Sequence, residues 1–472
     1  MNEYESYDAL GLAELIRKGE VKPSEILEAA IARLEERNPK INAVVIPMID
    51  EAREVAAGDL PDGPFRGVPF LLKDLHLLAS GTRTSDGCRL FEDFVADHDS
   101  EIVARYRRAG LVIFGKSASP EFGLTTSTES KLFGQTRNPW NTDHTAGGSS
   151  GGAAAAVAAG IVPLANASDG GGSIRIPSSC CGLFGMKPTR ARTPAGPDAG
   201  EGWSGMGAVH AVSRSVRDNA ALLDATAGPD LGAPYWAPPP ERPYLEEVGR
   251  PAGRLRIAFQ SRSFNGVETH PECTAAVEEA SRLCAELGHE VEETSLSIDT
   301  ETFRQATSTI IAANLRLIVE DRAAILGREF GADDLEPVTY ATVTGAAETG
   351  SAEYARSIQV IHSVGRQVAR FLERYDVLLT PTMATPPLPL GVLSLSNPDL
   401  GEFLGSLFKT IGFTQLFNAV GNPAMSVPLA WNDAGLPIGV QFAGRFGDEA
   451  TLFRLAGQLE QARPWFDRRP SL

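Results

Sequence analysis

The sequence lacks the residue patterns that metal hydrolases and phosphate-binding enzymes need. Its 472 residues include only seven histidines and five cysteines. No histidine pair matches HExxH, and the cysteines have no metal-type spacing, so the ligands of a catalytic metal are missing. No lysine follows a glycine cluster at the spacing of the phosphate-binding GxxxxGK[ST] loop. We therefore expect no metal site.

Long apolar runs and an excess of positive charge are also missing. The first residues, MNEYESYDALGLAELI, have neither the basic start nor the apolar segment of a signal peptide. No stretch approaches the length needed to span a bilayer. The formal net charge of −17 disfavours nucleic acid as a partner. The odd number of cysteines in so long a chain favours reduced thiols over disulfides. We expect a cytoplasmic protein with no membrane or nucleic-acid partner.

The pattern of apolar residues predicts an α/β fold. Apolar side chains recur at helical spacing from Pro23 to Leu34, and Asn38-Pro39 is expected to end that helix. A helix over 102–110 precedes a buried strand over 111–114, and such alternation indicates an α/β layer fold. The segment 117–140 is expected to be a long polar loop. No repeat or break is found, so we expect one domain over 1–472, with N-terminal helices in 1–60.

Glycine and serine are concentrated in the stretch 146–189. The hexapeptide GGSSGG at 147–152 is followed by an alanine-rich segment, which predicts a closely packed helix, and the apolar run 161–167 predicts a buried strand. The strand leads into Gly170, Gly171, Gly172 and Ser173. Successive N–H groups there can form an anion-binding concavity, and a hydroxyl beside it has the geometry of a nucleophile at an oxyanion hole. A flexible linker is the weaker interpretation, because apolar segments flank both clusters.

Lys73 stands at the end of another apolar run, 68–72. Most lysines are solvated surface charges, but this run has the composition of a strand buried on both faces. A buried ammonium loses hydration, so its pKa falls and the neutral amine becomes accessible near neutral pH. A neutral amine can act as a general base.

In GGSSGG, DGGGSIRIP, the later KPT and the upstream GVPFLLKD, the chain resembles the amidase signature family. Lys73, Ser149 and Ser173 also lie at spacings typical of that family. The resemblance covers most of the chain and is densest in a signature core of about 65–230. The segments INAVVIP and ARPWFDRRP are similar to those of bacterial nylon-oligomer (6-aminohexanoate cyclic dimer) hydrolases.

The resemblance implies one α/β/α domain around a large central mixed sheet, and it assigns roles to individual residues. It makes Lys73 the general base, Ser149 the bridging serine that relays the proton, and Ser173 the nucleophile, with the amides of 170–173 as the oxyanion hole. Ser150 competes for the bridging role but has the less suitable offset from Ser173. Asp169 and Arg175 are expected to form an ion pair that holds this loop. At Gly170 the chain has a glycine where many relatives carry a larger residue. The segment expected to line the substrate comprises Glu121, Phe122, Gly123, Leu124 and Thr125.

The implied reaction is hydrolysis of carboxylic amides through an acyl-enzyme, without a cofactor. Small to medium apolar amides, anilides and lactams are the expected substrates, and carbamates are reachable by the same triad. One alternative is the glutaminase component of a tRNA-dependent amidotransferase, which works only with partner chains. Another is an inactive binding protein, which the intact triad positions disfavour. The choice between monomer and homodimer is left open.

Overall fold

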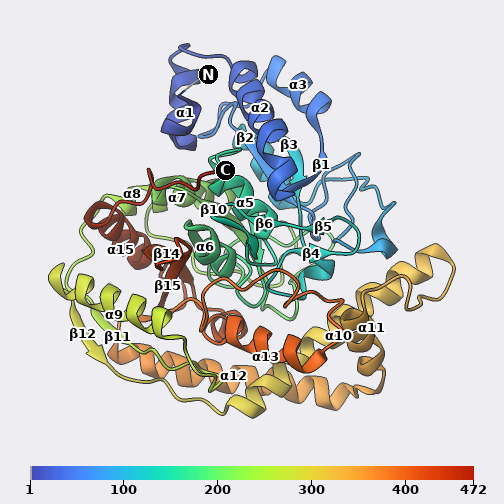
Figure 1. Ribbon diagram of the computed structural model, residues 1–472, viewed down its shortest axis with the longest axis vertical. Helices are drawn as coiled ribbons and strands as arrows, with labels where there is room; N and C mark the ends of the chain where they lie inside the picture. The colour runs from blue at the N-terminus through green and yellow to red at the C-terminus, as the bar shows by residue number, and fades with distance from the viewer. Residues whose placement is uncertain (1–2) are drawn as a thin grey trace.

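The computed structural model describes residues 3–472 and is organised around an eight-stranded mixed sheet (Figure 1). Across the sheet the strands are β12 (Glu290–Glu293), β11 (Arg256–Phe259), β13 (Val377–Pro381), β15 (Pro437–Gly444), β14 (Ala424–Trp431), β9 (Phe184–Lys187), β10 (Ala208–Ser213) and β8 (Leu164–Asp169). β11 pairs in parallel with β12 and β13, and the other neighbours are antiparallel. The predicted α/β fold with a large mixed sheet is confirmed.

Helices cover both faces of this sheet because its strands are apolar on both sides. In β13, Val377 and Leu379 pack into one core and Leu378 into another, as the alternation of side chains along a strand requires. The first core is closed by α7 (Val216–Thr226), α8 (Tyr244–Val248), α9 (Pro271–Glu286) and α15 (Glu449–Ala462). The second is closed by α10 (Thr300–Leu326), α12 (Ser351–Arg374) and α14 (Gln415–Val420).

A smaller sheet lies next to β8 and carries the predicted base. Its strands are β1 (Val44–Pro47), β3 (Val112–Ser117) and β2 (Pro69–Lys73). Every residue of β2 and β3 is buried. The backbone N–H of Lys73 donates to Asn166 Oδ1 in β8 at 3.0 Å, which fixes the end of β2 against the large sheet.

The remaining helices are α1 (Ala9–Arg17), α2 (Pro23–Ile41), α3 (Ile49–Ala57), α4 (Glu101–Arg108), α5 (Gly151–Ala158), α6 (Arg175–Cys181), α11 (Pro337–Gly345) and α13 (Leu400–Ile411). Of these, α1 to α4 come from the N-terminal part of the chain, α5 and α6 flank the glycine-rich segment, and α11 and α13 lie near α10 (Figure 1). In Figure 1, α1 to α3 lie at the opposite end of the molecule from α9, α10 and α12. Among residues 3–472, no helix combines the length and hydropathy that crossing a membrane requires.

Three local expectations are wrong. The helix α2 continues through Pro39 to Ile41, where the buried Ile41 side chain anchors its last turn and Asn42 in the left-handed region ends it. The strand β8 begins only at Leu164, because the chain first turns after α5 at Gly160, whose φ is +70°. The segment 117–140 is not a plain loop.

Short elements divide that segment and continue just beyond it, to Thr145. They are the 3₁₀ turn η3 (Glu121–Gly123) and the strands β4 (Glu129–Ser130), β5 (Gly134–Gln135), β6 (Arg137–Asn138) and β7 (Asn141–Thr145). β4 pairs with β5 and β6 with β7. Two short antiparallel pairs therefore lead the chain to GGSSGG.

Candidate active site

The side chain of Lys73 is fully buried and directed at two hydroxyl groups. Its Nζ lies 2.7 Å from Ser149 Oγ and 3.0 Å from Ser168 Oγ. Burial lowers the pKa of Lys73 to about 7, although the carboxylates of Asp169 and Asp86 act in the opposite direction. The amine is therefore neutral in a large fraction of molecules at neutral pH, and it is placed to take a proton from Ser149.

Ser149 is held at the start of α5 by close backbone packing. The peptide bond between Gly148 and Ser149 is cis. A Cβ atom at Gly148 would lie 2.7 Å from the backbone N of Ser127, so this position has no room for a side chain. Thr128 Oγ1 accepts from the N–H of Gly151 and donates to the carbonyl of Gly147, each at 3.0 Å. The glycines of GGSSGG thus allow neighbouring backbone to approach Ser149 from several sides.

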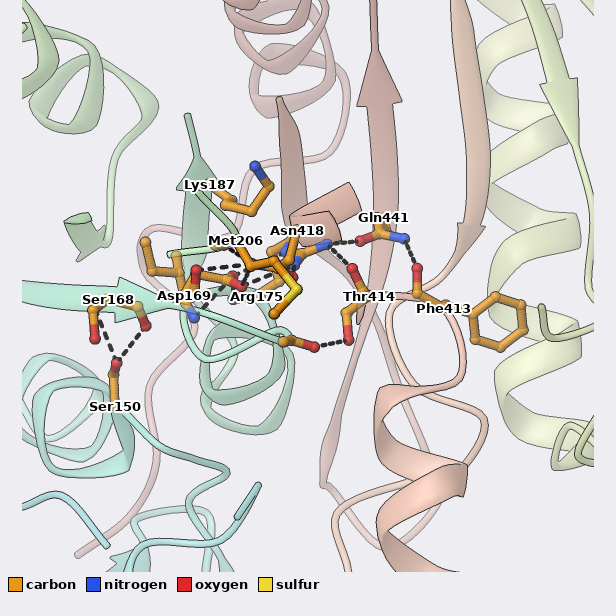
Figure 2. A network of polar contacts seen from close by, with 12 residues as sticks. Ser150, Ser168, Asp169, Arg175, Lys187, Met206, Phe413, Thr414, Asn418 and Gln441 are labelled. Atoms are coloured by element: carbon orange, nitrogen blue, oxygen red, sulfur yellow. Dashed lines mark hydrogen bonds and ion pairs between the residues drawn. The ribbon is translucent and has the colours of Figure 1, made fainter. Parts of the chain in front are cut away.

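Ser150 and Ser168 connect α5 to β8. Ser150 Oγ donates to the carbonyl oxygen of Ser168 at 3.2 Å and accepts from its N–H at 3.3 Å (Figure 2). The hydroxyl of Ser150 is thereby engaged, and the bond to Lys73 comes from Ser149. Ser168 was missed as a partner of the lysine. Asn166 and Ser168 are polar residues two positions apart in an otherwise apolar strand. Residues at this spacing share one face of the strand, which could have indicated a polar contact there.

Ser173 lies in the loop between β8 and α6, and the residue is 8% exposed. Gly172 has a φ of +139°, and a Cβ atom there would lie 2.5 Å from Thr414 Oγ1. Thr414 Oγ1 in turn donates to the carbonyl of Gly171 at 2.6 Å. Within the described chain, the N–H groups of 170–173 donate no hydrogen bond. These four consecutive N–H groups, that of Ser173 among them, therefore have no protein acceptor in the described chain, as the expected oxyanion hole requires.

Asp169 and Arg175 form a fully buried ion pair at the base of this loop, 2.9 Å apart. Asp169 Oδ2 also accepts from the N–H of Ile174 at 3.1 Å. Burial by itself raises the pKa of Asp169, but the guanidinium of Arg175 outweighs it and holds that pKa well below its usual range. The pair therefore stays charged and clamps both ends of the loop that carries Ser173.

Three polar residues from distant parts of the chain complete the clamp (Figure 2). Arg175 donates to the carbonyl of Thr414 at 2.9 Å, to Gln441 Oε1 at 2.6 Å and to Asn418 Oδ1 at 2.6 Å. Asn418 Nδ2 donates to Asp169 Oδ1 at 2.8 Å. Each charge of the buried pair is thus hydrogen-bonded, as a stable buried pair needs. Thr414, Asn418 and Gln441 were missed from the sequence, because no motif near them marks a site.

The segment 121–125 contacts the site through its backbone. A Cβ atom at Gly123, where φ is +68°, would lie 2.9 Å from Ser149 Oγ. The carboxylate of Glu121 instead accepts from the N–H of Glu336 at 2.8 Å, and burial raises its pKa to about 7.

The other side chains of this segment also turn to neighbouring elements. Phe122 is buried edge-on against Phe91, and Leu124 packs against the same cluster. Thr125 Oγ1 donates to the carbonyl of Leu393 at 2.8 Å. The four larger side chains are thus engaged by neighbouring elements, and the backbone of Gly123 lies beside Ser149.

The site thus combines a buried amine hydrogen-bonded to Ser149 with the unbonded backbone amides of 170–173, which include that of Ser173. A family model described as Amidase matches residues 25–453, and the chain belongs to the amidase signature family. It is a hydrolase that acts on carboxamide C–N bonds.

The relatives agree with this assignment. The chain is 38% identical to the 6-aminohexanoate-cyclic-dimer hydrolase of Paenarthrobacter ureafaciens, over 98% of this chain and 96% of that one. A solved structure of 6-aminohexanoate cyclic dimer hydrolase superposes with a TM-score of 0.93 at 37% identity, covering 98% of both chains. The solved structure of a bacterial aryl acylamidase of the same family superposes with a TM-score of 0.89 at 27% identity, covering 98% of this chain and 99% of that one.

The structural similarity to an amidotransferase subunit is lower than that to the two hydrolases. The solved glutamyl-tRNA(Gln) amidotransferase chain of Thermotoga maritima superposes with a TM-score of 0.76 at 27% identity, over 94% of this chain and 92% of that one. Its fold is shared, but it is more distant than the two hydrolases.

Proposed function

We propose that this chain hydrolyses small to medium, largely apolar carboxamides through Ser173, Ser149 and Lys73. The observation that carries the proposal is the 2.7 Å hydrogen bond between the fully buried Lys73 Nζ and Ser149 Oγ. An amine with a pKa near 7 is matched to general-base work at neutral pH. The free amides beside Ser173 support its role as the nucleophile.

In the first half-reaction, Ser173 Oγ attacks the carbonyl carbon of the amide. Its proton passes to Ser149 Oγ while Ser149 gives its own proton to Lys73 Nζ, so no charge builds up on either serine. The N–H groups of 170–173 donate to the oxyanion, a contribution worth about 10²–10³ in rate in comparable sites. The leaving nitrogen then takes a proton from Ser149, which Lys73 replenishes, and the amine departs.

In the second half-reaction, water hydrolyses the Ser173 ester. Lys73 is neutral again after the amine departs, so the same relay can deprotonate the water. The acid leaves and Ser173 regains its proton. Each proton that the relay accepts is returned within one cycle, so the reaction needs no external acid, base or cofactor.

Cyclic amides and anilides are the substrates to test first. The similarity to a cyclic-dimer hydrolase and to an aryl acylamidase supports cyclic amides and anilides as first candidates. Carbamates present the same carbonyl to Ser173 and belong to the same trial set. We also propose a cytoplasmic location, which the five free and buried cysteines support.

The test is hydrolysis by the purified full chain without any partner. A panel of simple amides, anilides, carbamates and 6-aminohexanoate cyclic dimer is compared between the wild type and Ser173→Ala. We expect the wild type alone to release amine from several members and the variant to release none. Activity only with glutamine and only after addition of amidotransferase partner chains would favour the glutaminase alternative instead.

A further inference from the structure

The loop from Gly202 to Gly207, between β9 and β10, adopts an unusual backbone conformation next to the candidate active site. Trp203 and Ser204 both lie in the left-handed region, with φ values of +48° and +53°. Side chains other than glycine rarely adopt this region, and each such residue costs on the order of 1 kcal/mol. The N–H groups of Gly205 and Gly207 both donate to the carbonyl of Gly202, at 3.1 and 3.0 Å, and close the turn.

Contacts from three directions hold this turn in place. Ser204 Oγ is hydrogen-bonded to the hydroxyl of Tyr354 in α12. Arg190 Nε donates to the carbonyl of Gly205 at 2.7 Å. Asn418, which also binds Asp169, donates to the carbonyl of Met206 at 3.2 Å. The surroundings therefore impose the strained conformation. They also connect it to the residues that clamp the loop carrying Ser173, residues 170–174, which we call the nucleophile loop.

The result of this conformation is that the indole of Trp203 lies on Gly170. A Cβ atom at Gly170 would be 2.7 Å from Cζ3 and 2.9 Å from Cε3 of the ring. At the next residue, Gly171, a Cβ atom would meet nothing within 4 Å. Gly170, Gly171 and Trp203 are all partly exposed. The ring thus borders the open side of the loop that presents the free amides and Ser173.

We propose that Trp203 is a specificity-determining residue, and that its ring favours substrates with a flat apolar group next to the scissile carbonyl. The inference rests on the proposed function. A carbonyl oxygen bound by the amides of 170–173 brings its carbon substituents close to the indole above Gly170. A broad aromatic surface at that place buries more area of a phenyl group than of a methyl group.

The first experiment measures selectivity in two substrate series. In one, 4-nitroanilides of benzoic and acetic acid differ only in the acyl group. In the other, acetanilide and N-methylacetamide differ only in the leaving group. Trp203→Ala should lower the ratio of kcat/KM for the aryl over the methyl member about 10-fold in at least one series, as loss of roughly one aromatic contact implies. The series that responds shows which side of the carbonyl faces the ring.

Matched controls separate this effect from a loss of folding. Trp236 is 60% exposed in a connection remote from Gly170 in sequence, and Trp236→Ala should leave both ratios unchanged. Trp203→Phe retains an aromatic ring and should keep most of the selectivity if the alanine variant melts early. If the wild type hydrolyses no member, or if Ser173→Ala retains activity, the proposed function fails. If activity depends on Ser173 but both ratios are unchanged in Trp203→Ala, the specificity role is overturned.

A double-mutant cycle tests the contact itself. Gly170→Ala by itself forces the ring to move and should lower kcat/KM for the aryl substrate about 10-fold or more. In the Trp203→Ala background the same methyl group has room, so the further loss from Gly170→Ala should be several-fold smaller than in the wild-type background. Additive losses in the two backgrounds would show that the ring does not occupy the space in front of Gly170.

Discussion

Gly123 faces the hydroxyl of Ser149 so closely that a Cβ atom would lie 2.9 Å from Ser149 Oγ. Its φ of +68° belongs to the region that favours glycine. Gly123 therefore serves the proposed relay in two ways: it adopts the left-handed conformation at the end of η3, and it leaves room for the Ser149 hydroxyl to point at Lys73.

Gly123→Ala should cause a large loss of catalytic rate and only a small loss in the free energy of unfolding. The methyl group displaces Ser149 Oγ from Lys73, and a misplaced catalytic group can cost about 10²-fold. The left-handed backbone adds a stability loss of about 1 kcal/mol. Steady-state kinetics and a thermal melt measure both quantities. A similar variant at Gly19, whose φ is +72° and whose Cβ would meet nothing within 4 Å, should lose stability alone.

The lowered pKa of Lys73 predicts how the rate depends on pH. Its folded pKa of about 7 is below the ordinary value, and the neutral form is the base, so kcat/KM should rise from acidic pH and level off above about pH 8. Lys73→Met should lower the rate on the order of 10³-fold or more and abolish this limb. The measurement is a pH profile of kcat/KM for an unactivated amide.

The matched control for Lys73 is Lys187, a second fully buried lysine. Burial lowers the pKa of Lys187 to about 7 as well, but its Nζ donates to the carbonyl of Pro188 and does not contact Ser149. Lys187→Met should therefore keep the acidic limb. If the acidic limb persists in Lys73→Met and disappears in Lys187→Met, the titrating group is Lys187, and the assignment to Lys73 is wrong.

Ser149 should matter most when the leaving group needs a proton. An amine is a poor leaving group unless protonated, whereas an activated aryl ester leaves as a stable phenolate. Provided that departure of the amine limits the rate, Ser149→Ala should reduce amide hydrolysis more than hydrolysis of an aryl ester with the same acyl group. Rates for both substrates in both proteins measure the difference. Equal losses would refute the leaving-group role, and no loss on either substrate would exclude Ser149 from the relay.

The buried pair of Asp169 and Arg175 should support activity as well as stability. Asp169→Asn leaves the guanidinium buried without its countercharge, which typically costs about 3–5 kcal/mol. Because Asp169 also holds the nucleophile loop, kcat should fall about 10²-fold in the molecules that remain folded. Chemical denaturation and active-site titration separate the two effects.

A second buried pair gives the comparison for Asp169. Arg192 and Glu449 are 3.0 Å apart and nearly inaccessible, and neither hydrogen-bonds to the nucleophile loop. Glu449→Gln should destabilise the protein to a similar degree while kcat per folded molecule stays near wild type. If both variants lose kcat equally, the role of Asp169 is no more than structural.

The sequence predicted the parts of the site that depend on local chemistry. Lys73 follows a run of apolar residues, so its burial could be inferred from the segment itself. The glycines beside Ser149 and Ser173 marked places where backbone approaches backbone. The alternation of strands and helices predicted an α/β fold and the family resemblance implied the large mixed sheet, and the structure confirms both.

The residues that could not be predicted come from far along the chain. Thr414, Asn418 and Gln441 reach the loop that carries Ser173 only because the folded chain brings α14 to the end of β8 and packs β15 against α6. Ordinary polar residues carry no local mark of such contacts. Trp203 was missed for the same reason, since its contact with Gly170 depends on a turn that its own residue type disfavours. The end of α2 was misplaced because tertiary packing of Ile41 outweighs the effect of Pro39.

The most direct test of the proposed mechanism is to trap the acyl-enzyme. The wild type is mixed with a slowly hydrolysed amide, quenched in acid and digested, and the peptides are analysed by mass spectrometry. The mechanism predicts one acyl adduct on Ser173, absent from a Ser173→Ala protein that melts like the wild type and has lost amide hydrolysis. An adduct on another residue, or turnover by Ser173→Ala near the wild-type rate, would contradict it.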